Sequence, residues 1–81
     1  RVLDITIDRE GRFYVNQREV INTDLETLKR ALEKAAMKES ELPVIITADA
    51  QTPHQAVMTA MDAASQLGYL HMTFAARQPG D

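Results

Sequence analysis

The stretch that most constrains this fold is a run of β-branched residues, Val44-Ile45-Ile46, with a helix start shortly after it. Such a run suits a strand that is covered on at least one face and lies inside a sheet. Pro43 has no N–H to donate, so it can only precede or open that strand. In Thr52-Pro53-His54-Gln55, Thr52 suits an N-cap acceptor and Gln55 completes a capping box. A strand, a short loop and a capped helix form the first half of a β-α-β unit.

The N-terminal segment predicts a hairpin. Residues 2–8 alternate, with Leu3, Ile5 and Ile7 on one face, which is the period of a half-buried strand. A polar turn with Gly11 leads to a second short strand at residues 13–15. After another polar turn, residues 20–21 predict a third, very short strand.

Two segments have the periodicity of amphipathic helices. The first opens near Thr23, which has the capping-box spacing with Glu26. The second runs from Pro53 to about Leu67, and Gly68 follows where a C-terminal cap belongs. The expected buried positions are Leu25, Leu28, Leu32, Ala35 and Ala36 in the first helix, and Val57, Ala60, Met61, Ala64 and Leu67 in the second.

These elements follow one another in the order β-β-(β)-α-β-α-β, with a last strand within residues 69–76. We expect the strands at 44–48 and 70–76 to be parallel neighbours, because a helix connects them. The predicted fold class is α+β: a two-layer sandwich with two helices packed on one face of a small mixed sheet, and the other face partly wet. One domain is expected over residues 1–77, with a flexible tail at 78–81.

Composition excludes several classes of protein. The 81 residues suffice for one small domain. The net charge of −3 comes from dispersed charges without a basic stripe, so no nucleic-acid partner is expected. Without cysteine there is no disulfide framework and no thiolate metal site. No apolar run is long enough to span a membrane. Because the chain begins at Arg1 and not at Met, we interpret it as an excised domain whose parent carries any membrane segment.

The residues that could carry chemistry do not form a known motif. His54 and His71 could join Asp49 and Asp62 in a metal or acid–base site, but their spacing matches no ligand pattern. Asp49 ends the central strand, where sites in parallel units gather, although a plain loop carboxylate near a helix start is the simpler interpretation. We therefore expect no enzyme, no cofactor and no metal, and keep Asp49 and His54 as candidate loop contacts with a partner.

A longer pattern joins these fragments. The apolar strand leads to Ala48-Asp49, then Pro53-His54, the helix at 56–64 and Leu67-Gly68. This pattern resembles the periplasmic domain of the ExbD/TolR family, and ExbD more than TolR. The N-terminal half is similar too, except that Gln17 stands where the family often has glycine after asparagine.

The resemblance implies a function. ExbD proteins have a short cytoplasmic N-terminus, one membrane helix and a periplasmic domain. With ExbB they form an inner-membrane motor that is driven by the proton motive force. The motor energises TonB, which opens outer-membrane receptors for iron-siderophore uptake. The proton-handling aspartate lies in the membrane helix, outside this chain, so the domain's own roles would be dimerisation and contact with TonB.

Two alternatives remain open at this point. The first is a TolR-like subunit of the Tol-Pal system, with a role in envelope integrity and contact with peptidoglycan. The second belongs to another class: a small stand-alone ligand-binding or enzymatic α+β domain. This alternative requires a pocket into which several polar side chains point, and the sequence offers no convincing one.

The last strand is the expected contact surface. No later element covers its far side, so its backbone groups are free to pair with another chain. We expect a homodimer through residues 70–76, and addition of a TonB strand either there or along Phe13–Val15. A proline at Thr73 is expected to weaken the pairing by removing an outward donor. The expected partner-binding residues are Tyr69, Leu70, His71, Met72, Thr73 and Phe74.

Overall fold

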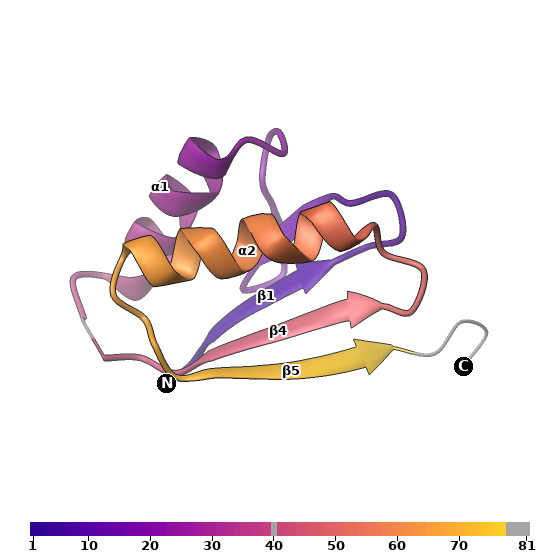
Figure 1. Ribbon diagram of the computed structural model, residues 1–81. Helices are drawn as coiled ribbons and strands as arrows, with labels where there is room; N and C mark the ends of the chain where they lie inside the picture. The colour runs from indigo at the N-terminus through magenta and orange to yellow at the C-terminus, as the bar shows by residue number, and fades with distance from the viewer. Residues whose placement is uncertain (40, 78–81) are drawn as a thin grey trace.

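The computed structural model describes residues 1–39 and 41–77. Both helices lie on the same face of a single sheet, so the molecule has two layers (Figure 1). This arrangement confirms the predicted α+β sandwich. The predicted tail at 78–81 lies outside the described residues. The elements are β1 (Leu3–Ile7), β2 (Phe13–Val15), β3 (Arg18–Glu19), α1 (Leu25–Ala36), β4 (Val44–Asp49), α2 (His54–Gln66) and β5 (Met72–Arg77).

The sheet is mixed and has the strand order β3-β2-β1-β4-β5. The pairs β1–β2 and β2–β3 are antiparallel, whereas β4 runs parallel to both β1 and β5. The predicted parallel pairing of the two C-terminal strands is therefore confirmed. The β-branched run of β4 lies between two strands, as its composition predicted.

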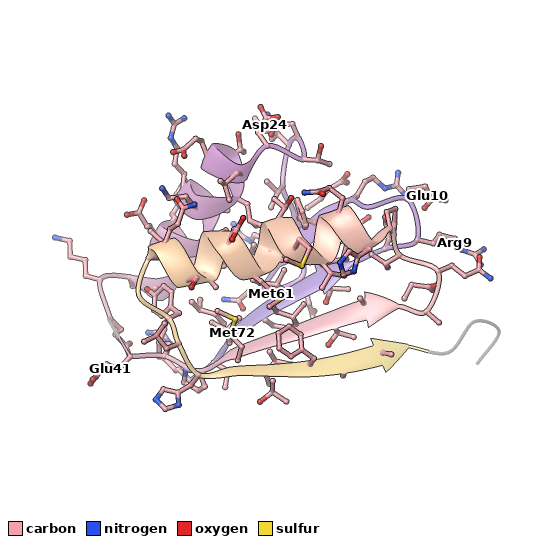
Figure 2. The ribbon with its side chains drawn as sticks, in the orientation of Figure 1. Arg9, Glu10, Asp24, Glu41, Met61 and Met72 are labelled. Atoms are coloured by element: carbon pink, nitrogen blue, oxygen red, sulfur yellow. The ribbon has the colours of Figure 1, made fainter. Side chains whose placement is uncertain are left out.

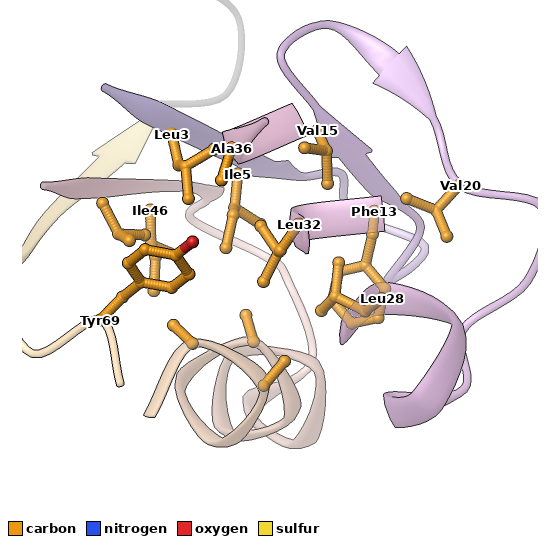
Figure 3. Close-up of a cluster of buried hydrophobic side chains, with 14 of the residues drawn as sticks. Leu3, Ile5, Phe13, Val15, Val20, Leu28, Leu32, Ala36, Ile46 and Tyr69 are labelled. Atoms are coloured by element: carbon orange, nitrogen blue, oxygen red, sulfur yellow. The ribbon is translucent and has the colours of Figure 1, made fainter. Parts of the chain in front are cut away.

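The pleat of each strand sorts its side chains between the layers. In β1 the odd-numbered residues are buried under the helices, and Asp4 and Thr6 lie on the opposite, open face, where they are only partly covered. Figure 3 shows side chains of both layers meeting in one core. The largest fully buried side chains are Phe13, Leu3, Ile5, Ile7, Leu28, Leu32, Ile46 and Val44.

The two helices contribute differently to this core. α1 buries Leu28, Leu32 and Ala36 at helical spacing, as predicted. The buried residues of α2 are all alanines: Ala60, Ala63 and Ala64. Small side chains let a helix backbone approach its neighbours closely. Ala63, which the sequence pattern missed, is buried with Ala60 and Ala64, which lie three residues before and one residue after it, and Met61 is only partly buried.

The predicted caps at the two helix starts are wrong. The N-cap positions are Asp24 for α1 and Pro53 for α2, and neither makes a side-chain cap hydrogen bond. Thr52 Oγ1 instead donates to the carbonyl oxygens of Ile7 at 3.2 Å and Asp8 at 3.0 Å. The hydroxyl therefore joins the start of α2 to the end of β1, which no local pattern could reveal.

The end of α2 follows the prediction. Gly68 has φ +88°. Its N–H donates to the carbonyl of Ser65 at 3.0 Å, and the Tyr69 N–H donates to that of Ala64 at 2.9 Å. These two bonds form a Schellman motif, which requires a left-handed residue just after the helix.

Two strand positions differ from the prediction. The third strand is Arg18–Glu19, not residues 20–21, because Asn16 and Gln17 form a tight turn with φ values of 49° and 72°. Two consecutive left-handed residues bring the chain back at once, as in type I′ hairpins. The last strand begins at Met72, not at Tyr69, since Tyr69 completes the Schellman motif and turns into the core.

Candidate functional site

The long free edge of the sheet is β5. It pairs with β4 from Met72 to Arg77, and no other strand among residues 1–39 and 41–77 lies along its outer side (Figure 1). The alternative edge at Phe13–Val15 is not free, because β2 lies between β1 and β3. At the opposite side of the sheet, β3 has only two residues. β5 therefore offers the longer template for strand pairing.

The register shows which β5 backbone groups point outward. The Val44 N–H donates to the His71 carbonyl at 2.8 Å, and Val44 is opposite Met72. In a parallel ladder, a residue of one strand bonds to the two neighbours of its opposite residue. Backbone groups of residues 71, 73 and 75 therefore face β4, and those of Met72, Phe74 and Ala76 face outward. The expectation that the Thr73 N–H points outward is wrong, because this N–H faces β4 and belongs to the β4–β5 ladder.

Side chains make this edge apolar on the helix side. Met72 lies below α2, which carries Met61 (Figure 2), and both side chains pack against the core. Phe74 is opposite the core residue Ile46, but it is 51% exposed. An aromatic side chain half in water beside unpaired backbone groups is typical of a surface that a partner covers.

The expected contact residues before the strand have different environments. Tyr69 is buried, and its hydroxyl donates to the Glu39 carbonyl at 3.0 Å, so it is a core residue. Leu70 is 74% exposed, and His71 is exposed as well. Only Met72, Thr73 and Phe74 of the expected set lie on β5 itself.

The two candidate loop contacts lie at the carboxyl end of β4. Asp49 is its last residue, and Asp49 Oδ1 accepts from the Gln51 N–H at 2.9 Å, so it shapes the turn into α2. His54 is exposed at the first position of α2. His71 lies beside the opposite end of β4, so the structure does not bring the two histidines together.

A polar cluster that sequence reasoning missed closes the β1–β2 turn. Asp8 Oδ1 accepts from the Arg12 N–H at 2.8 Å, and Oδ2 accepts from Arg12 Nε at 2.6 Å and from the Tyr14 hydroxyl at 3.2 Å. Burial alone would raise the pKa of Asp8, but these hydrogen bonds and the Arg12 charge hold the pKa below its usual value. The Asp8–Arg12 spacing around Gly11 is the only local signal of this cluster.

The described residues contain no candidate metal site and no membrane-spanning helix. Within residues 1–39 and 41–77, no group of three histidine or acidic side chains could hold a metal ion. Neither helix in these ranges is long and apolar enough to cross a membrane.

A comparison with protein families then gives the identity of the domain. The family model described as Biopolymer transport protein ExbD/TolR matches residues 1–78, which include all the helices and strands that the structure describes. The chain belongs to the ExbD/TolR family. No curated protein matches the chain.

Membership of the ExbD/TolR family gives the general role of the chain. The family consists of inner-membrane-anchored periplasmic proteins in biopolymer transport and energy transduction, and it is not a class of enzymes. Its members generally work with ExbB or TolQ and with TonB or TolA. The chain is therefore an energy-transducing subunit of biopolymer transport.

Proposed function

We propose that this chain is the periplasmic domain of an ExbD-like motor subunit that binds an extended TonB-like segment by strand addition along β5. The observation that carries the proposal is the outward backbone of Met72, Phe74 and Ala76 beside the half-exposed Phe74 side chain. In this function the subunit is anchored in the inner membrane, works with an ExbB-like partner, and uses the proton motive force to energise outer-membrane transport.

Strand addition suits a motor that must release its partner. Main-chain hydrogen bonds along an edge give affinity with little dependence on sequence, and alternate side chains add specificity. Truncating most β5 side chains should therefore change affinity little. Phe74 is the exception, because an aromatic side chain that becomes covered is a common source of binding energy.

The same edge supports a homodimer. A two-fold axis perpendicular to both strands would set β5 of one protomer antiparallel to β5 of another, because an isologous contact uses the same surface twice. Membrane anchoring of two subunits would raise their effective concentration and favour such a contact. Partner and second protomer would then share or compete for one edge, which couples dimerisation to partner binding.

An NMR titration tests this function. The ¹⁵N-labelled domain is titrated with a peptide from the periplasmic stretch of TonB and, separately, with one from TolA. We expect shifts of the β5 amides with the TonB peptide and weaker ones with the TolA peptide. Amide shifts confined to α1 and α2, with no shift of any β5 amide, would overturn strand addition. A stronger response to TolA would assign the chain to the Tol system.

A further inference from the structure

A recess near β3, at the edge of the sheet opposite β5, has no role in the function proposed above. It lies between α1 and the β2–β3 hairpin and has a volume of about 490 Å³. We call it the α1–β3 groove. The buried and half-buried apolar residues that line it are Val15, Val20, Ala31 and Ala35. Because β3 and β5 are opposite edges of the sheet, the groove and the β5 edge are separate surfaces.

Unpaired positive charge surrounds this apolar recess. Arg18, Arg30 and Lys34 line it and are exposed, and Glu19 is the single acidic residue in the lining. Arg18, Arg30 and Lys34 form no ion pair with the described residues, whereas Lys29, on the same helix, pairs with Glu26. A local excess of positive charge in a chain of net charge −3 runs against the average of its surface.

An exposed apolar side chain adjoins these charges. Ile21 lines the groove and is 90% exposed, more than the other exposed large apolar side chains of the described residues. Along α1 the lining runs from Thr27 to Ala35, which is a length of about 12 Å at the helical rise of 1.5 Å per residue. That length fits about four residues of an extended chain.

We propose that the α1–β3 groove binds a short acidic peptide segment of another protein, with one apolar side chain on Ile21 and Ala31 and carboxylates on the three cations. Charge complementarity with these cations requires a partner segment of negative charge. The apolar lining sets its class, because a free inorganic anion has no apolar part to bury there. An anionic membrane is a poorer fit, since a flat lipid surface does not fill a recess.

A model peptide tests the proposal. The probe is an acetylated and amidated peptide of sequence Glu-Glu-Leu-Glu-Glu, added to the ¹⁵N-labelled domain. We expect saturable amide shifts at residues 20–21 and along the groove face of α1, with β5 silent. Affinity should fall as salt rises, because exposed charges are screened. The matched peptides Gln-Gln-Leu-Gln-Gln and Lys-Lys-Leu-Lys-Lys should bind more weakly.

Three variants separate the groove from general charge effects. Arg30→Gln and Lys34→Gln should each weaken binding of the acidic peptide by about two- to fivefold, the usual worth of an exposed ion pair. Lys38→Gln makes the same charge change outside the groove and should leave the affinity unchanged.

Several results would overturn the acidic-peptide site. They are equal affinity for the lysine peptide, equal weakening by Lys38→Gln, and absence of any shift at millimolar peptide. Vesicles of phosphatidylglycerol provide a further arm. If they perturb the groove amides and the peptide does not, the occupant is a lipid surface. Because β5 is silent in the expected result, failure here leaves the strand-addition proposal untouched.

Discussion

At the scale of single residues, Thr52 shows how one hydroxyl can serve a distant element. Its contacts to the carbonyls of Ile7 and Asp8 join the entry of α2 to the end of β1. Thr52→Val keeps the shape but leaves those carbonyls without this donor, so it should destabilise the fold by about 1 kcal/mol. Urea unfolding measures the change, with Thr52→Ser as the control that keeps the hydroxyl. Equal midpoints for valine and wild type would contradict the assignment.

Gln17 holds a conformation that glycine adopts more easily. Its φ of 72° lies in the left-handed region, which costs a residue with a side chain roughly 1 kcal/mol. Gln17→Gly should therefore stabilise the domain by about that amount, less the entropy that glycine loses on folding. Thermal unfolding measures the difference. Asn16→Gly is the contrast, because it removes the Oδ1 that accepts from the Asp4 N–H at 3.0 Å and should not stabilise. A lower melting temperature for Gln17→Gly would contradict the argument.

Asp8 should make stability depend on pH. Its folded pKa is lowered, so its contribution is present above the unfolded pKa and is lost as the pH falls through the folded one. The stability difference between wild type and Asp8→Asn should thus be largest near neutral pH and shrink below about pH 4. Urea unfolding at several pH values measures it. A difference that stays constant down to pH 2 would contradict the role given to the carboxylate.

At the scale of elements, the periodicity of the sequence predicted the features that depend on neighbouring residues. Both helices and the glycine at the end of α2 follow from residue patterns that act within a few positions. The parallel pair follows from the helix that connects its two strands. The caps failed for a tertiary reason. Thr52 had two kinds of backbone group within reach, the N–H groups of its own helix and the carbonyls at the end of β1, and only the packing of α2 against β1 decides between them.

The edge strand β5 gives a prediction that depends on its register. Ala76 has outward backbone groups, so Ala76→Pro should leave the β4–β5 ladder intact and weaken partner binding severalfold. Ala75→Pro removes a donor to β4 and should instead destabilise the fold. Peptide titrations and urea unfolding of the two variants separate the effects. If Ala76→Pro unfolds as readily as Ala75→Pro, the inferred direction of the amides is wrong.

At the scale of the whole molecule, the sequence indicated the family and the free last strand, but not the detail of the site. The outward amides are those of Met72, Phe74 and Ala76, and finding them required the register against Val44. Tyr69 looked like a strand residue because an alternating pattern cannot distinguish a strand from the exit of a Schellman motif. The α1–β3 groove joins residues of a hairpin and a helix, so no local pattern marks it.

The arrangement of the sheet places the two proposed contact surfaces on separate sides of the molecule. Among residues 1–39 and 41–77, no strand lies along the outer side of β5, and the α1–β3 groove lies at the opposite edge of the sheet. The core between them is a continuous set of apolar side chains from both layers (Figure 3). If both proposals hold, a partner strand at β5 and an acidic segment in the groove would bind at the same time.

Amide hydrogen exchange tests the central claim, addition of a partner strand to β5, most directly. In the free domain at low concentration, the amides of Met72, Phe74 and Ala76 should exchange fast, and those of Thr73 and Ala75 slowly, because only the latter pair with β4. With saturating TonB peptide, the three fast amides should become protected. Full occupancy by the peptide with these three amides still exchanging fast would contradict strand addition along β5.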